Sequence, residues 1–393
     1  MDSTGRSSLL QEFTTQQNEN AFLRAFSFST IQLPVDSASE VELADRVVIM
    51  DEIGFIFQLM EREQKVASKP DDLEKWITNY VVRRGVKQIQ NTRDLLRSYM
   101  GLSLVNNFGH RTLISPGDPD LLVSVIVYRV PPKTRAFRAA RFKKNRTGGF
   151  VHILRDVEYF EIVHHFVTPA ELSDYFGFRR DILINWDPDA TAVSEAALIG
   201  QYLLEDYSSP PAKRFESASR SRGGPTACEF SFVLDSLASS IASQESDYAD
   251  TDCYDVLAEL ARLARYELRA LRQQVRLALE AVRSNRFELP YRIASARGAG
   301  FLVLPLTKEF HNRALGALRS LSEACKYELD LERQIGIGMW RNSEFVDIEW
   351  IFLNGGNLPD PDLDERLAHN YPFRRASEQR LPPIFVRAPG VVP

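Results

Sequence analysis

The chain has 393 residues, of which 44% are hydrophobic and 26% charged, a composition typical of globular proteins and long enough for two domains. Its formal net charge of −5 excludes a protein that is basic overall, so any nucleic-acid binding must come from local clusters of positive charge. No apolar run approaches the roughly 18 to 20 residues of a membrane span, and we expect neither a membrane partner nor a secretory signal. Three widely spaced cysteines, Cys228, Cys253 and Cys325, fit a reducing, cytoplasmic location better than a disulfide framework or a zinc site.

Strands and helices alternate in the N-terminal half. The expected elements are a helix at 18–26, strands at 42–50 and 55–60 with a turn near 51–54, a helix at 70–100, a strand at 121–130, and a strand and helix within 152–175. The two early strands are nearly continuous runs of Val, Ile and Phe, as expected of strands that are buried on both faces. Pro70 followed by Asp71 and Asp72 is typical of a helix N-terminus. The order of elements predicts an α/β core with a mixed sheet flanked by helices.

The C-terminal half predicts a different, helical and α+β region. We expect a helix at 254–286, a strand at 301–306, a helix at 308–331, and a hairpin with strands at 335–340 and 345–353. The Ser-, Pro-, Gly- and Arg-rich segment 208–226 is the predicted linker. The predicted organisation is therefore an α/β domain at 1–207, the linker at 208–226, a second domain at 227–367 and an extended tail at 368–393.

The stretch around the first predicted hairpin has the layout of a phosphodiesterase metal site. Asp45 lies near the start of one buried strand, and Gln58 lies near the end of the next. Hard oxygen ligands of this kind suit Mg²⁺, which polarises a phosphate and lowers the pKa of an attacking water. Because side chains alternate along a strand, Gln58 and Met60 share a face.

On these residues the stretch resembles the PD-(D/E)xK restriction-endonuclease-like nucleases, over residues 10–165. In this resemblance Asp45 occupies the position of the metal-binding aspartate, Gln58 the acidic position, which is glutamine in some active Mrr-like members, and Met60 the position of the lysine. Glu19 corresponds to a helical glutamate found in many members, and Gln88 and Lys87 to residues of the following helix that face the active site and the phosphate. The resemblance implies a restriction-endonuclease-like core, Mg²⁺ or Mn²⁺ as cofactor, DNA as substrate, and a role in restriction, repair or anti-phage defence.

Met60 departs from the family pattern at the position that carries charge. A thioether donates no hydrogen bond and has no charge, so it cannot stabilise the negative charge that develops on the phosphate. Loss of an electrostatic contact of that kind typically lowers a rate by about 10² to 10³. Three explanations stay open: a natural pseudo-nuclease kept for binding, a displaced lysine such as Lys65 or Lys87, or an introduced inactivating substitution. The competing interpretation of the whole stretch is a strand end that packs on a helix, with the chain acting as a non-catalytic binding or assembly module.

Two basic segments are candidate polyanion sites. The first follows the last predicted strand and is interleaved with Phe137, Phe142 and Phe150; its candidate nucleic-acid-binding residues are Arg138, Arg141, Lys143, Lys144 and Arg146. The alternative for this segment is a solvated loop or an exposed helix face. The second is the helix at 254–286, where arginines recur at three- and four-residue steps beside an apolar stripe. That helix is either a solvated face over a core face, a phosphate-binding ridge, or an interface for a second copy or another protein.

Overall fold

The computed structural model of the chain describes most residues from 21 to 373. The described residues are 13, 21–29, 32–36, 39–42, 44–62, 70–98, 102–106, 109–114, 121–130, 140–145, 149–186, 193–222, 250–342, 345–357 and 359–373. The chain divides into two compact units, residues 1–272 and 273–393. Within the described residues, no helix is both long and apolar enough to cross a membrane.

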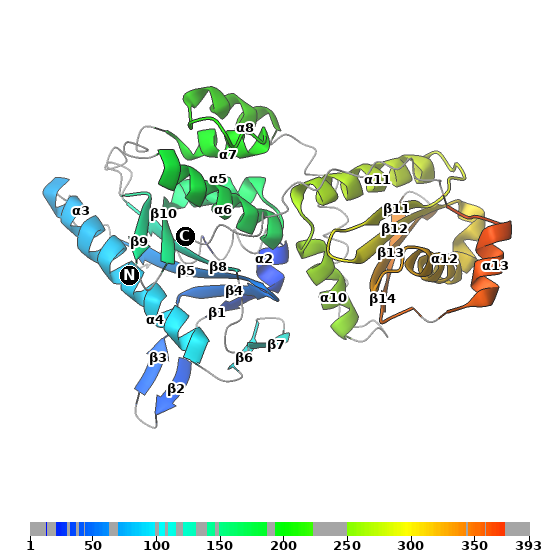
Figure 1. Ribbon diagram of the computed structural model, residues 1–393, viewed down its shortest axis with the longest axis horizontal. Helices are drawn as coiled ribbons and strands as arrows, with labels where there is room; N and C mark the ends of the chain where they lie inside the picture. The colour runs from blue at the N-terminus through cyan, green and yellow to red at the C-terminus, as the bar shows by residue number, and fades with distance from the viewer. Residues whose placement is uncertain are drawn as a thin grey trace, which may run out of the picture. The chain divides into compact units, whose positions relative to one another are not determined.

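A six-stranded mixed sheet forms the centre of the first unit (Figure 1). Its strands, in spatial order, are β1 (Ser27–Ser29), β4 (Arg46–Met50), β5 (Ile53–Glu61), β8 (Leu121–Arg129), β10 (Gly149–Arg155) and β9 (Phe142–Asn145). β1, β4 and β5 are antiparallel to one another, β8 and β10 run parallel to β5, and β9 returns antiparallel at the edge. A short helix, α2 (Ala21–Ala25), precedes β1.

The hairpin that joins β4 to β5 is tight. Met50 pairs with Ile53, so only Asp51 and Glu52 form the turn. Asp51 adopts a positive φ of 48°, a conformation that aspartate tolerates better than most residues and that two-residue hairpin turns favour. The register of this turn places Arg46 opposite Phe57, which brings the residue before β4 close to Gln58.

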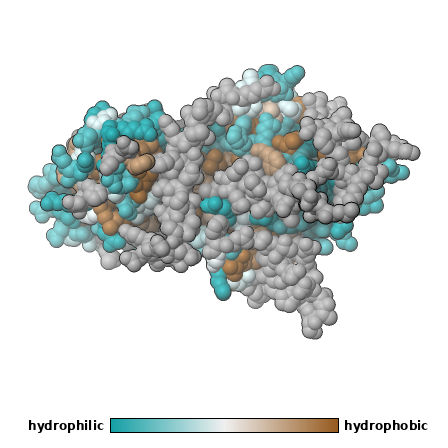
Figure 2. All heavy atoms as spheres, turned by 180° about the vertical axis from the view of Figure 1, so that it is seen from behind, coloured by the Kyte–Doolittle hydropathy of each residue, from teal (hydrophilic) through white to brown (hydrophobic). Residues whose placement is uncertain are grey.

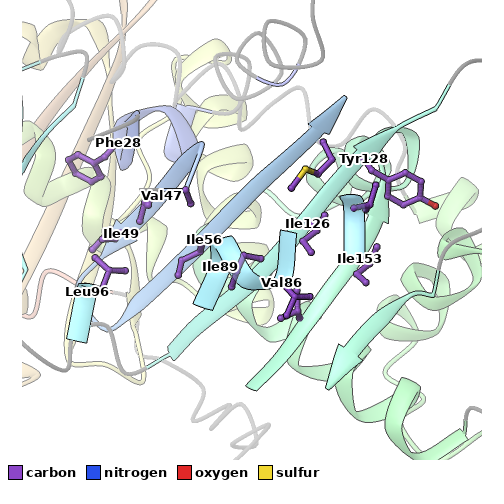
Figure 3. Packing of buried hydrophobic residues seen from close by; sticks show 14 of the residues in the cluster. Phe28, Val47, Ile49, Ile56, Val86, Ile89, Leu96, Ile126, Tyr128 and Ile153 are labelled. Atoms are coloured by element: carbon purple, nitrogen blue, oxygen red, sulfur yellow. The ribbon is translucent and has the colours of Figure 1, made fainter. Parts of the chain in front are cut away.

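One long helical segment covers the first face of the sheet. It consists of α3 (Pro70–Trp76), a π-helical stretch η1 (Ile77–Arg84) and α4 (Gly85–Ser98). Val86 and Ile89 of α4 pack against Ile56, Ile126 and other apolar side chains of the sheet (Figure 3). Gly85 permits a close approach, because a Cβ there would lie only 2.9 Å from Ile126 Cδ1.

Helices α5 (Asp156–His165) and α6 (Pro169–Trp186) cover the opposite face (Figure 1). The Phe57 ring lies 5.5 Å from the Tyr159 ring, and Phe55 lies 6.3 Å from Phe176. The phenylalanines of β5 therefore face one helical layer while Ile56 faces the other, which explains why the whole strand is apolar.

Further elements complete this unit. They are α7 (Glu195–Leu203), the 3₁₀-helix η4 (Lys213–Phe215), α8 (Glu216–Arg222), α10 (Asp250–Ala261), the two-stranded sheet of β2 (Gln32–Asp36) and β3 (Ser39–Glu42), and the two-stranded sheet of β6 (Leu102–Val105) and β7 (Arg111–Ile114). η4 packs closely on α7, since a Cβ at Gly200 would lie 1.9 Å from the Phe215 carbonyl oxygen. The unit boundary falls within α11 (Arg265–Arg283).

A four-stranded sheet organises the second unit. Its order is β11 (Tyr291–Ala294), β12 (Ala299–Leu306), β13 (Arg333–Asn342) and β14 (Phe345–Asn354), with β12 and β13 parallel and the outer pairs antiparallel. The 3₁₀-helix η6 (Lys308–Arg313) and helix α12 (Ala314–Glu328) connect β12 to β13, and α13 (Pro361–His369) follows β14. Leu318 of α12 packs against Leu302, Leu304 and Trp340. On the face of the molecule shown in Figure 2, hydrophilic residues predominate among those described, and hydrophobic ones form small separate patches.

The mixed α/β class with sheets flanked by helices is confirmed, and several element boundaries differ from the prediction. The predicted strand at 42–50 is divided: Glu42 ends β3 of a separate two-stranded sheet, and β4 begins at Arg46. Residues 213–222 of the predicted linker form helices that pack on α7, while 223–226 lie outside the described residues. The predicted helix at 254–286 is interrupted between Ala261 and Arg265, where Glu267 accepts a hydrogen bond from Ala264 N and Thr168 donates one to Leu263 O.

Candidate functional site

Asp45 and Gln58 meet across the β4–β5 hairpin. Gln58 Nε2 and the Leu59 backbone N–H both donate hydrogen bonds to Asp45 Oδ2, the second at 2.7 Å. Asp45 lies just before β4, and its neighbour Arg46 is the first residue in register with β5. The aspartate thus caps the end of the paired region of β4 while its carboxylate lies beside the Gln58 amide. The two predicted ligands are neighbours in the structure.

Met60 lies on the same face of β5, two residues beyond Gln58, as the alternation of strand side chains requires. Only 3% of its surface is exposed, and it belongs to the apolar cluster under α4. Its Cε atom lies 3.2 Å from the position that a Cβ on Gly85 would take. At the position that corresponds to the lysine of the nuclease pattern, the chain therefore has a packed core side chain.

Helix α4 covers this centre with a stripe of residues one turn apart. Thr92 Oγ1 accepts a hydrogen bond from Ala44 N at 3.0 Å, directly before Asp45, and donates one to Gln88 O. Gly85 contacts the Met60 position at the other end of the stripe. Gln88 lies between these two contacts, and its Oε1 atom is buried without a hydrogen-bond partner in the described part of the chain. An unsatisfied buried acceptor has a cost of about 1 to 3 kcal/mol, which a cation or a donor at this place would relieve.

The donor set fits a hard divalent cation in its chemistry. Asp45 supplies a carboxylate, and Gln58 would supply its amide oxygen if the amide turned over, which would put two oxygens side by side and favour a cation between them. Among the described residues, no group of three His, Cys, Asp or Glu side chains is placed to hold a metal ion. Glu19, predicted as a further ligand, lies outside the described residues. A bound Mg²⁺ would polarise a phosphate oxygen at this centre.

The predicted nucleic-acid-binding residues do not all have the same environment in the structure. Lys87 is exposed on α4, and Lys143 and Lys144 are exposed on the edge strand β9. Arg141, by contrast, is buried: its Nη2 atom lies 2.5 Å from Glu195 Oε2, and its Nη1 atom donates to Val193 O. Arg141 thus serves an internal ion pair. Arg138 and Arg146 lie outside the described residues.

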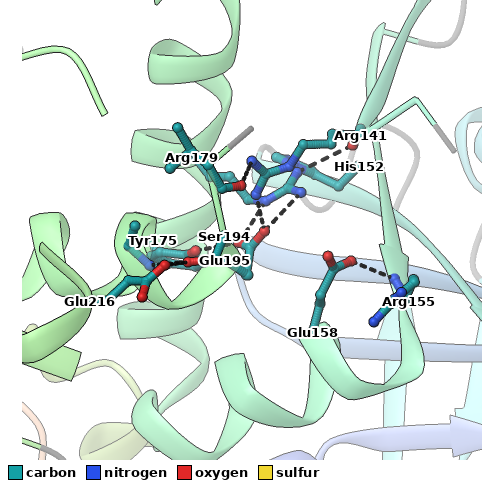
Figure 4. Close-up of polar contacts among 11 residues, drawn as sticks. Arg141, His152, Arg155, Glu158, Tyr175, Arg179, Ser194, Glu195 and Glu216 are labelled. Carbon is teal, nitrogen blue, oxygen red and sulfur yellow. Dashed lines mark hydrogen bonds and ion pairs between the residues drawn. The ribbon is translucent and has the colours of Figure 1, made fainter. Parts of the chain in front are cut away.

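A buried polar network surrounds Arg141 and was not foreseen from the sequence (Figure 4). Glu195, at the start of α7, accepts hydrogen bonds from Arg141, from Arg179 Nε at 2.8 Å and Nη2 at 3.2 Å, and from Tyr175 OH at 2.5 Å. Arg179 has no exposed surface, and its Nη1 lies 3.0 Å from His152 Nδ1. Isolated Arg, Glu and Tyr residues at wide spacing give no periodic signal, so sequence reasoning could not group them.

Charge interactions decide the protonation states in this network. Burial alone would raise the pKa of Glu195, but Arg179 and Arg141, with the hydrogen bonds, hold it at about 2. Burial, together with Arg179, lowers the pKa of His152 well below its ordinary value, which favours the neutral imidazole as the acceptor for Arg179. The network fastens β10 and the residue before β9 to α6 and α7, and all five of its side chains are buried.

The predicted arginine stripe at 254–286 is largely neutralised within the chain. Arg262 pairs with Asp51 and Glu259, and Arg265 pairs with Glu171. Arg276 lies 3.4 Å from Glu280. The apolar stripe is buried as well, including Leu260, Leu268, Leu271, Val275 and Leu279. The solvated-face and core-face interpretation therefore accounts for this helix better than a phosphate ridge or an open interface.

Comparison with known proteins gave no match to a family model, to a curated protein or to a solved structure. The candidate centre at Asp45 and Gln58 therefore depends on the geometry described above and on the resemblance of its residues.

Proposed function

We propose that the first unit is a metal-dependent nuclease-type domain acting on DNA, whose phosphodiester hydrolysis is weakened by Met60. The observation that carries the proposal is the meeting of Asp45 and Gln58 across an antiparallel hairpin, with Met60 two residues beyond on the same face. The element order of the unit supports it. In the six-stranded sheet β1, β4 and β5 are antiparallel, the long helical segment follows β5, and β8 runs parallel to β5, which agrees with the restriction-endonuclease-like order; the separate β2–β3 and β6–β7 sheets are inserted along the chain between these elements.

In this proposal each residue has a separate task. Asp45 and the Gln58 amide oxygen hold the Mg²⁺ or Mn²⁺ ion, with Glu19 as an additional ligand. Gln88, whose amide oxygen has no hydrogen-bond partner among the described residues, orients the water or the phosphate from α4. Met60 supplies no charge to the developing phosphorane, so the rate is expected to be about 10² to 10³ below that of a lysine-containing site.

The competing function is a non-catalytic DNA-binding or assembly module on the same fold. The burial of Met60 in the apolar cluster favours it, because a core side chain at this position needs no catalytic explanation. The two functions predict different effects of a Met60→Lys substitution on DNA cleavage.

The deciding experiment is a gain-of-function test with plasmid DNA and Mg²⁺ or Mn²⁺. We expect Met60→Lys to raise the cleavage rate by at least about 10² over the natural chain, and Met60→Leu, which keeps the apolar volume, to leave it unchanged. Cleavage by Met60→Lys must also disappear in EDTA and in the Met60→Lys/Asp45→Asn double variant. A folded Met60→Lys protein that cuts no faster than this double variant would rule out the catalytic proposal in favour of the binding module.

A further inference from the structure

A ladder of stacked cations and aromatic rings runs along the outside of the long helical segment. Arg62, just after β5, lies with its guanidinium carbon 5.8 Å from the Trp76 ring centre. Trp76 stacks on Tyr80 with centroids 6.0 Å apart and planes 20° from parallel. Arg84 completes the series, 4.7 Å from the Tyr80 ring. Trp76, Tyr80 and Arg84 are spaced four residues apart and therefore share one side of the helix.

Within the described ranges, the cations of this surface have no acidic ion-pair partner. Arg62, Arg83, Arg84 and Lys87 make no ion pair in the described part of the chain. The arginines of the helical region 250–283 are different, since Arg262 and Arg265 are both paired with carboxylates. In a chain with a net charge of −5, four neighbouring unneutralised cations form a local positive site that is suited to a polyanion.

The local backbone displays these side chains to solvent. Residues Ile77–Arg84 form a π-helix of 8 residues, longer than the usual single-turn bulge, and π-helical turns are frequent at functional sites. Ile77 and Val81 face the core, so Tyr80, Arg83 and Arg84 face outward. Gly85 then brings the next turn against Ile126 and the Met60 position. The exposed cations and the buried contacts of the candidate centre therefore alternate along the same stretch of helix, with Arg84 and Lys87 exposed and Gly85 buried.

The chemistry of the ladder selects a single strand over a duplex. Each ring contact occupies one face of a guanidinium group and leaves the other face free to stack, and the exposed Arg84 keeps its in-plane N–H groups for phosphate oxygens. Aromatic rings and guanidinium planes stack on unpaired bases, whereas the bases of a duplex are already stacked on one another. Tyr80, of which 36% is exposed, is the more exposed of the two rings of the ladder.

We infer that Arg62, Trp76, Tyr80, Arg83, Arg84 and Lys87 form a binding surface for single-stranded DNA. The inference rests on the proposed function for the identity of the polyanion, and deepens it by naming the strandedness of the ligand. It requires no hydrolysis, so binding is measured in EDTA and separately from cleavage.

The test is fluorescence anisotropy with a labelled oligo-dT of about 20 nucleotides, longer than the roughly 4 to 16 nucleotides of common single-strand sites. We expect Arg83→Gln/Arg84→Gln to weaken binding at least tenfold, and to reduce the slope of log K against log salt by about 1.4, or 0.7 for each lost phosphate contact. Tyr80→Leu should weaken oligo-dT binding by roughly fivefold or more through lost stacking and leave the weaker binding of a duplex of the same length unchanged.

Lys213→Gln/Arg214→Gln is the matched control, because these are also adjacent exposed cations of the same unit, and Arg214 also lies over an aromatic ring, that of Phe215. Equal binding by the two double variants would overturn the inference. Duplex binding as tight as oligo-dT binding, with no effect of Tyr80→Leu, would overturn the single-strand assignment. Loss of binding in Arg83→Gln/Arg84→Gln while Met60→Lys fails to cut would support this surface and reject the catalytic proposal, and the converse result would do the opposite.

Discussion

Replacement of Glu195 by glutamine should destabilise the protein strongly. The Glu195 carboxylate accepts hydrogen bonds from two buried guanidinium groups, those of Arg141 and Arg179, and from the Tyr175 hydroxyl. In Glu195→Gln both arginines stay buried, the opposite charge is gone, and the new amide NH₂ group faces donors. Breaking a buried ion pair from one side leaves an uncompensated charge, which typically costs about 3 to 5 kcal/mol.

The pKa of Glu195 gives an independent magnitude. Its value of about 2 in the fold, against 4.5 ordinarily, corresponds to about 3.4 kcal/mol of preference for the charged form, at about 1.36 kcal/mol per pKa unit. Both routes therefore predict a loss of about 3 to 5 kcal/mol near neutral pH. Because the folded pKa is depressed, this contribution is complete above about pH 4.5 and disappears as the pH falls towards 2.

Urea unfolding of the natural chain and of Glu195→Gln, across pH 7 to 3, measures the difference in free energy of unfolding. The difference should be large at pH 7 and shrink below about pH 4.5. Glu280→Gln is the control, since its pair with Arg276 is exposed and should contribute only about 0.3 to 0.5 kcal/mol. A Glu195→Gln effect below about 1 kcal/mol, or one that is constant with pH, would refute the reasoning.

Two further predictions concern stability. Because burial and Arg179 depress the folded pKa of His152, its contribution to stability is complete above about pH 6.5 and is lost as the pH falls below that value. His152→Gln should therefore flatten the decline in the free energy of unfolding below about pH 6.5; an unchanged slope would contradict this. Gly200→Ala should destabilise the protein by more than about 3 kcal/mol, because the added Cβ would overlap the Phe215 carbonyl. Gly177→Ala, in a helix with open space around the added methyl, should stabilise it by up to about 1 kcal/mol. Thermal unfolding measures both, and equal shifts in the two variants would show that η4 moves freely from α7.

The parts of the fold that the sequence predicts best are those with strong local signals. β5 and β8 are apolar runs bounded by turns, and the start at Pro70 marks the long helix. The break between α10 and α11 has no Gly or Pro and depends on two hydrogen bonds, from the Thr168 hydroxyl to Leu263 O and from Ala264 N to the Glu267 carboxylate. Tertiary contacts of that kind are not visible in helical periodicity, which continues across the break.

In the candidate site, too, the features that depend on local sequence are predictable and those that depend on tertiary contacts are not. The spacing of Gln58 and Met60 along one strand is a local property, and their shared face follows from alternation. The fate of Arg141 depends on Glu195, 54 residues away, so a run of basic residues could not reveal that one member is buried. The Arg62–Trp76–Tyr80–Arg84 ladder likewise depends on the tertiary structure, because Arg62 and Trp76 are distant in the sequence and come together only in the fold.

The bond from Leu59 N to Asp45 Oδ2 has a consequence for how this position can change in evolution. A side chain that satisfies a backbone donor at the end of a strand pair is selected for folding whether or not it binds a metal. An acidic residue at position 45 can therefore be kept whether position 60 holds a lysine or a methionine, and its presence alone is no sign of metal binding. For the same reason Asp45→Ala combines a folding defect with a chemical one, and Asp45→Asn, which keeps an acceptor for Leu59, separates them.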